Sequence, residues 1–251
     1  MVVGKLREGK RIVGTMIRMI KDPGIAHVAA EAGLDFIMFD MEHGPYSMET
    51  FADVAKVARS IGLGIFARVP ELSRGYVSRI MDAGAEGVMV PMISTRKEAE
   101  ALANWARYTP LGNRGLGSAG VATNFSDIGT DVLAFMAGQN ENTLAIAQIE
   151  TEEAIDNIEA IAEVEGIDVL LIGPNDLSVS LGVPGQVNGS KVQAAIEKVV
   201  EAAQKNSKVF AIHSGDALLE KWIPKGMQIV MNSLDITVLK SGFATIAKKY
   251  H

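Results

Sequence analysis

The stretch DFIMFDMEHGPYSMETFADVAKVARSIGLGIFARV, residues 35–69, contains an apolar run, an amphipathic segment and a second apolar run. The two runs, Asp35 to Asp40 and Gly64 to Val69, are hydrophobic almost throughout, which is typical of parallel strands buried on both faces. The segment between them, Ser47 to Ser60, has helical periodicity, begins at a serine that can cap its first turn and is followed by Gly62. The stretch therefore predicts a parallel β-sheet covered by helices.

The same alternation occurs eight times along the chain. Besides the two runs above, the expected strands are Ile12 to Met19, Gly87 to Met92, Thr143 to Ile149, Asp168 to Ile172, Lys208 to His213 and Met227 to Asn232. Besides Ser47 to Ser60, the expected helices are Pro23 to Glu31, Arg74 to Asp82, Arg96 to Arg107, Glu152 to Glu163, Lys191 to Asn206, Asp216 to Ile223 and Ile236 to Lys249. Longer intervals follow the fourth and sixth strands, and extra loops are expected there.

Eight strand–helix units in 251 residues predict an α/β fold, a (β/α)8 TIM barrel that forms a single domain over residues 1–251. The functional site of such a barrel lies at the carboxyl ends of its strands. The alternative fold is an open, doubly wound sheet. Its dinucleotide-binding form carries G-x-G-x-x-G directly after the first strand, and Met19 to Gly24 lack that motif.

Composition narrows the classes of partner. The net charge of −6 disfavours binding to nucleic-acid phosphates and to anionic lipid. The absence of cysteine excludes disulfides and thiolate metal sites and fits a reducing cytosol. Basic residues interrupt the first segment, and no uncharged apolar run reaches the roughly 18 residues of a spanning helix. We expect a soluble, cytoplasmic protein with neither a nucleic-acid nor a membrane partner.

Polar residues concentrate directly after four of the expected strands. They are Asp40, Glu42 and His43 after the second strand, Arg68 at the end of the third, Gln148 and Glu150 at the fifth, and Gly173, Pro174, Asn175 and Asp176 after the sixth. Because the carboxyl ends of all strands meet at one rim of a barrel, these residues are expected to face a common site.

Glu150 and Asp176 follow neighbouring strands, so their carboxylates are expected to lie close together. Two negative charges at short range need a proton or a cation between them, and oxygen ligands favour Mg²⁺ or Mn²⁺. Two protein ligands leave positions open for water and a bidentate substrate, as Lewis-acid chemistry requires. The alternative is that one carboxylate merely caps a following helix, and Glu150 does precede the amphipathic run from Glu152.

His43 and Arg68 are the other candidates for chemistry. Asp40 and Glu42 flank His43 and could orient its imidazole as a general base. Arg68 suits a substrate carboxylate or an enolate oxygen, although a salt bridge to Asp40 or Glu42 is the structural alternative. His213, at the end of the seventh strand, is a weaker candidate. The strand ends carry no lysine for a Schiff base, apart from Lys21 just past the first strand, and no G-x-S-x-G motif occurs.

Five motifs together resemble the HpcH/HpaI family of metal-dependent class II pyruvate aldolases. They are FDMEHGPYS (Phe39 to Ser47), ARVP (Ala67 to Pro70), RYTPLGNRGLGS (Arg107 to Ser118), AQIET (Ala147 to Thr151) and IGPNDLS (Ile172 to Ser178). The likeness covers nearly the whole chain in order. It is strongest to the branch of 4-hydroxy-2-oxoheptanedioate and 2-keto-3-deoxy-sugar-acid aldolases.

This resemblance implies cleavage of a 4-hydroxy-2-oxo acid into pyruvate and an aldehyde, or the reverse addition, with Mg²⁺, Mn²⁺ or Co²⁺. It also implies a homohexamer in which a C-terminal helix, residues 236–250, is exchanged between subunits. By motif match, Glu150 and Asp176 would bind the metal, Arg68 would steady the pyruvate enolate, and His43 with Asp40 would handle a proton through a metal-bound water. The pyruvate pocket would comprise Gln148, Gly173, Pro174 and Asn175. Asp82 matches an acidic residue that reaches a neighbouring subunit's site, although an Asp near a helix end can equally be structural.

The chain departs from the family pattern where an aldehyde would enter. Arg18 and Met19 stand at the first strand end, where many relatives have smaller or less charged residues. In the expected pyruvate pocket, Asn175 replaces a frequent alanine, which could alter how pyruvate is bound. Two other functions remain open. A CoA-thioester lyase of the citrate-lyase β or malyl-CoA lyase type would need basic residues for CoA phosphates, for which Arg114 is the clear candidate. A barrel that binds a keto acid without turnover is the other.

Overall fold

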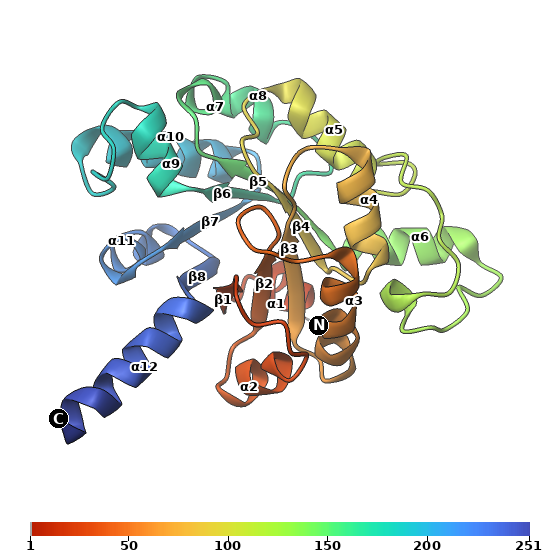
Figure 1. The fold of residues 1–251 in the computed structure, drawn as a ribbon. Coiled ribbons are helices and arrows are strands. Elements are labelled where there is room, and N and C mark those ends of the chain that lie inside the picture. The colour runs from red at the N-terminus through yellow and green to blue at the C-terminus, as the bar shows by residue number, and fades with distance from the viewer. Residues whose placement is uncertain (1) are drawn as a thin grey trace.

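Eight parallel strands form a closed barrel in the computed structural model, which describes residues 2–251 (Figure 1). Each strand pairs with the next in chain order, and β8 closes the barrel against β1. The strands are β1 (Ile12–Ile17), β2 (Phe36–Asp40), β3 (Gly64–Arg68), β4 (Gly87–Val90), β5 (Leu144–Ile149), β6 (Val169–Ile172), β7 (Val209–Ser214) and β8 (Ile229–Leu234). All of them overlap the expected runs, so the predicted (β/α)8 fold is confirmed.

The expected helices are also present; the one over Arg74–Asp82 has the predicted bounds, and the others have shifted ends. They are α2 (Ile25–Glu31), α3 (Met48–Ser60), α4 (Arg74–Asp82), α5 (Arg96–Ala106), α10 (Ser190–Lys205), α11 (Asp216–Trp222) and α12 (Asp235–Tyr250), while the expected helix Glu152 to Glu163 is split at Asn157 into α7 (Glu152–Asp156) and α8 (Ile158–Ala162). The sequence did not predict α1 (Val2–Arg7), η1 (Val121–Thr123), α6 (Val132–Glu141), α9 (Pro174–Ser180) or η2 (Ile223–Lys225). α6 and α9 lie in the two long intervals where extra loops were expected.

Local sequence signals set where the helices begin and end. Ser47 caps α3 by accepting a hydrogen bond from the Thr50 amide at 3.1 Å. Thr95 and Glu98 form a capping box at the start of α5. After α4 the chain turns at Gly84, whose φ of 104° is open to glycine and strained for other residues.

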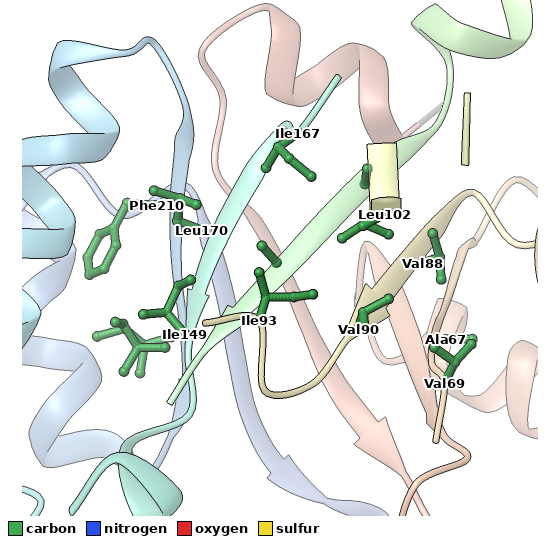
Figure 2. Close-up of a cluster of buried hydrophobic side chains, with 14 of the residues drawn as sticks. Ala67, Val69, Val88, Val90, Ile93, Leu102, Ile149, Ile167, Leu170 and Phe210 are labelled. Carbon is green, nitrogen blue, oxygen red and sulfur yellow. The ribbon is translucent and has the colours of Figure 1, made fainter. Parts of the chain in front are cut away.

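The strands separate two layers of apolar side chains. The inner layer includes Met16, Phe36, Met38, Phe66 and Met89, all fully buried. The outer layer fills the space between strands and helices; Figure 2 shows part of it, with Leu102 of α5 among strand side chains such as Val88 and Ile149. The alternation along each strand decides which polar residues face the barrel axis.

Residues two positions beyond the inner layer therefore face the interior above it. On this spacing Arg18 follows Met16, Asp40 follows Met38, and Arg68 follows Phe66. The opposite end of the barrel is closed by α1, whose Val2, Val3 and Leu6 pack against the inner layer. The polar residues thus meet at one rim.

The last helix, α12, extends away from the barrel (Figure 1). It exposes the apolar side chains of Ile236, Val238, Phe243 and Ile246. Among residues 2–251, no helix combines the length and the apolar character needed to cross a bilayer.

Candidate active site

A cavity of about 270 Å³ opens at the carboxyl ends of the strands, and we call it the strand-end cavity. Most of the residues predicted for the site line it: His43, Arg68, Gln148 and the run Gly173 to Asp176. A larger cavity of about 620 Å³ lies at the amino ends of the strands, next to Leu6 and Gln228. The strand-end cavity is the candidate site because the titratable groups converge there.

Asp40 forms a bidentate ion pair with Arg68, which lines this cavity. They are register partners on β2 and β3, and Arg68 donates from Nε to Oδ1 at 3.0 Å and from Nη2 to Oδ2 at 2.8 Å. Arg18 donates from Nε to the same Oδ2 at 2.7 Å. Burial alone would raise the pKa of Asp40, but Arg68, helped by the His43 amide and Arg18, holds that pKa below its ordinary value.

Glu42 extends this chain of charges, since Nη1 of Arg68 lies 3.0 Å from its Oε2. The salt bridges considered as a structural alternative for Arg68 are therefore both present. They fix the guanidinium at the wall of the strand-end cavity, so the ion pairs and a role in substrate binding are compatible.

His43 lies at the edge of the cavity with its side chain 51% exposed. Asp40 contacts only the backbone of His43: its Oδ1 accepts a hydrogen bond from the His43 N–H at 3.2 Å. The carboxylate next to the imidazole is that of Glu42, 3.8 Å from Nε2. Asp40 therefore holds the loop that carries His43, and of the two acids expected to orient the ring, Glu42 is the one beside it.

Glu150 is buried directly after β5, and both of its carboxylate oxygens are held. The Met92 amide donates to Oε1 at 2.9 Å, and the Gln148 amide nitrogen donates to Oε2. Burial raises the pKa of Glu150 to about 7, and the negative charges of Asp176 and Glu42 add to that effect, against the opposing bond from Met92.

Asp176 stands in the first turn of α9 on the wall of the strand-end cavity. Within residues 2–251 its side chain makes no hydrogen bond or ion pair, and the described chain holds no cluster of three or more His, Asp or Glu side chains suited to a metal. The donor set is thus two carboxylates, one buried with a raised pKa and one unpaired. Such hard oxygen donors fit Mg²⁺ or Mn²⁺ if water and substrate complete the coordination.

Arg18 and His213, both noted in the sequence, line the cavity, and four further residues there were not singled out from the sequence. Met16, Met89, Leu171 and Leu234 supply apolar walls, and Arg18 and His213 supply polar ones. The signal that could have found them is the two-residue alternation that already places Arg68.

Asp82 lies outside the strand-end cavity of this chain. It ends α4 and accepts a hydrogen bond from Nη2 of Arg114 at 2.6 Å. Arg114 is 5% exposed and stacks on the ring of Tyr108 at 4.7 Å. The expectation that Arg114 could bind CoA phosphates is not supported, because its guanidinium is buried and paired.

Comparison with known proteins identifies the family of this chain. The model described as HpcH/HpaI aldolase/citrate lyase matches residues 19–241, and the chain belongs to that family. It is 30% identical to a hydroxypyruvate/pyruvate aldolase of Roseobacter denitrificans, over 98% of this chain and 94% of the relative. It is 34% identical to a 4-hydroxy-2-oxovalerate aldolase of Novosphingobium aromaticivorans, over 94% and 89%.

A solved structure agrees with these relatives. The HpcH/HpaI aldolase from Desulfitobacterium hafniense DCB-2 superposes with a TM-score of 0.93 at 33% identity, over 98% of this chain and 95% of that one. The chain is therefore an aldolase, an enzyme that makes or breaks carbon–carbon bonds, and the resemblance inferred from its motifs is confirmed.

Proposed function

We propose that this aldolase depends on a divalent metal and cleaves a 4-hydroxy-2-oxo acid into pyruvate and an aldehyde, or runs the reverse addition. The observation that carries the proposal is that Asp176 and Arg68, both on the cavity wall, lie near enough to buried Glu150 for their charges to act on its carboxyl group. Two acids that can hold a divalent metal, next to the guanidinium of Arg68, suit a substrate that carries a carboxylate and an adjacent keto oxygen.

Glu150 and Asp176 would hold the metal, with Mg²⁺, Mn²⁺ and Co²⁺ as the candidates. Bound there, the ion would supply positive charge next to the substrate's keto oxygen, as a Lewis acid. Gly173 supports this assignment, because the backbone before α9 lies directly against the Glu150 carboxylate. Gln148, Gly173, Pro174 and Asn175 would line the pocket for the three-carbon keto acid.

Side chains of the protein then orient the substrate and transfer its protons. In cleavage, His43 takes the proton of the C4 hydroxyl, the C3–C4 bond breaks, and the electron pair passes to the keto group as an enolate while the aldehyde leaves. Arg68 steadies the enolate charge, and a proton returned to C3 gives pyruvate. Asp40 keeps Arg68 and the His43 backbone in place.

The test uses the exchange of pyruvate methyl protons with D2O, followed by NMR, with Mn²⁺, Mg²⁺ or Co²⁺ added. We expect exchange to require a metal, and Glu150→Gln and Asp176→Asn to abolish it and to weaken metal binding in calorimetry. The matched control is Glu153→Gln, because Glu153 is exposed three positions further on. Full exchange in both site variants, or in metal-free protein, would refute the proposal.

We further propose that the enzyme works as a homo-oligomer, a hexamer by family resemblance, in which α12 packs on another copy. The exposed apolar residues of α12 support this, because such a face is unfavourable in water. Asp82 would then serve the site of a neighbouring subunit. The cytoplasmic location expected from the sequence stays a prediction.

A further inference from the structure

The strand-end cavity has two chemically different sides. One side carries the keto-acid and metal residues of the proposed function, from Arg68 on β3 to Asp176 on α9. The opposite side is formed by the ends of β1, β7 and β8 and presents Arg18, His213 and Leu234. In the proposed reaction the keto acid occupies the first side, which leaves the second side for the aldehyde half of the substrate.

The backbone that carries Arg18 is held rigidly. Asp235, the first residue of α12 and 4% exposed, accepts three successive backbone N–H groups. Its Oδ1 accepts from Arg18 at 3.1 Å, and its Oδ2 accepts from Met19 and Ile20, each at 2.9 Å. The loop after β1 therefore presents Arg18 in a fixed position, as a specificity residue requires.

The Arg18 guanidinium is anchored by one atom only. Its Nε donates to Asp40, whereas Nη1 and Nη2 make no hydrogen bond within residues 2–251. Asp40 has little capacity left, since Arg68 already binds both of its oxygens. Among the neighbours on this side, Leu234 is apolar and His213 directs Nε2 to the Ser233 carbonyl at 3.0 Å.

Arg18 lines the cavity, and the four N–H donors of its Nη1 and Nη2 have no acceptor within residues 2–251; the side chain is 28% exposed. We propose that Arg18 is a specificity-determining residue that binds an anionic oxygen group, a carboxylate or a phosphate, on the aldehyde half of the substrate. The inference rests on the proposed aldolase reaction and adds to it the class of aldehyde. A planar guanidinium binds such groups through two parallel hydrogen bonds. The cavity volume of about 270 Å³ restricts the choice to short aldehydes.

The experiment measures kcat/KM for aldol addition of pyruvate to matched aldehydes. Glyoxylate against glycolaldehyde tests a carboxylate, and glyceraldehyde 3-phosphate against glyceraldehyde tests a phosphate. In Arg18→Gln we expect kcat/KM to fall about 10- to 100-fold for one acidic aldehyde and less than about threefold for its neutral partner. Arg18→Lys keeps the charge but not the fork, and should recover part of the preference. The control is Arg96→Gln, because Arg96 pairs with Glu100 and Glu163 on the surface of α5.

Pyruvate methyl exchange separates this inference from the function on which it rests. If the wild-type protein shows no exchange, the proposed function fails. If the wild type exchanges and Arg18→Gln loses acidic and neutral aldehydes equally, or neither, the role of Arg18 fails. Loss of exchange in Arg18→Gln would also overturn it, because Arg18 would then act by supporting Asp40. Selective loss of the acidic aldehyde with intact exchange supports it, and the aldehyde pair affected identifies the anion.

Discussion

Gly173 lies against the Glu150 carboxylate so closely that a β-carbon on residue 173 would fall well inside 3.0 Å of Oε2, a separation that real side chains essentially never show. The same β-carbon would be 2.8 Å from Nε2 of Gln148. The residue before α9 therefore has to be glycine if Glu150 is to keep its position, whatever the backbone angles allow.

Gly173→Ala is expected to displace Glu150 and to cut aldolase activity and metal affinity at least about tenfold. Overpacking of this kind destabilises a fold by about 1–3 kcal/mol, so urea unfolding is measured alongside activity. Gly138→Ala on α6 is the matched control, because its β-carbon would meet open space. Unchanged metal affinity in Gly173→Ala would contradict the close packing described for this loop.

Asp40→Asn removes the charge that Arg68 and Arg18 share. Breaking a buried ion pair on one side costs about 3–5 kcal/mol, and Asp40 is fully buried, so we expect a large loss in the free energy of unfolding. We also expect kcat/KM for the 4-hydroxy-2-oxo acid to fall about 100-fold or more, because Arg68 loses its anchor. Asp53→Asn, which breaks an exposed pair with Lys56, should change stability by less than about 1 kcal/mol. Equal effects of the two substitutions would refute the assignment.

His213 makes stability depend on pH in one direction. Burial lowers its pKa below 6.5; the Arg68 and Arg18 charges act the same way, against the Ser233 carbonyl and Asp40. Between that lowered pKa and 6.5 the unfolded chain binds a proton that the folded chain does not. The free energy of unfolding should therefore fall as pH drops through 6.5, by up to about 1.4 kcal/mol per pH unit from this group.

His213→Gln should flatten that part of the stability profile, measured by urea unfolding from pH 5 to pH 8. His27→Gln on the exposed side of α2 should leave the profile as in the wild type. A profile whose slope is the same in all three proteins would show that His213 is not the responsible group.

Phe243→Asp on α12 is expected to reduce assembly, because it places a charge on the exposed apolar face. Light scattering after size-exclusion chromatography should show smaller species for this variant. Ser241→Asp adds the same charge elsewhere on the helix and should leave the assembly intact. If Phe243→Asp keeps the wild-type mass, α12 does not mediate association.

The barrel could be predicted from the sequence because its strands are continuous apolar runs, each followed by an amphipathic helix. The missed helices lack that pattern. In α6 only Asn140 is buried, so no apolar face marks it. α9 begins at Pro174 and reads as a loop, although proline in the first turn is also a helix-start signal.

The positions of Arg68 and Asp176 on the cavity wall could be predicted because each side chain lies at or just after a strand end. Glu150 also follows a strand but is buried and is not part of the cavity lining. Contacts between segments far apart in the chain could not be predicted. Arg114 was considered as an exposed cation for CoA phosphates. In the structure it is buried and pairs with Asp82, 32 residues away in the chain. The sequence also could not show that Glu42 lies beside the His43 imidazole while Asp40 binds the His43 backbone, because this depends on the directions of the side chains.

Asp235 is the first residue of α12, and its carboxylate binds the backbone of the loop after β1. If α12 shifted when it packed on another copy of the chain, Asp235 would displace the backbone that carries Arg18. If α12 packs on another copy and Arg18 selects the aldehyde, as proposed, Asp235 joins the two, and substitutions on α12 should then alter which aldehyde the enzyme accepts.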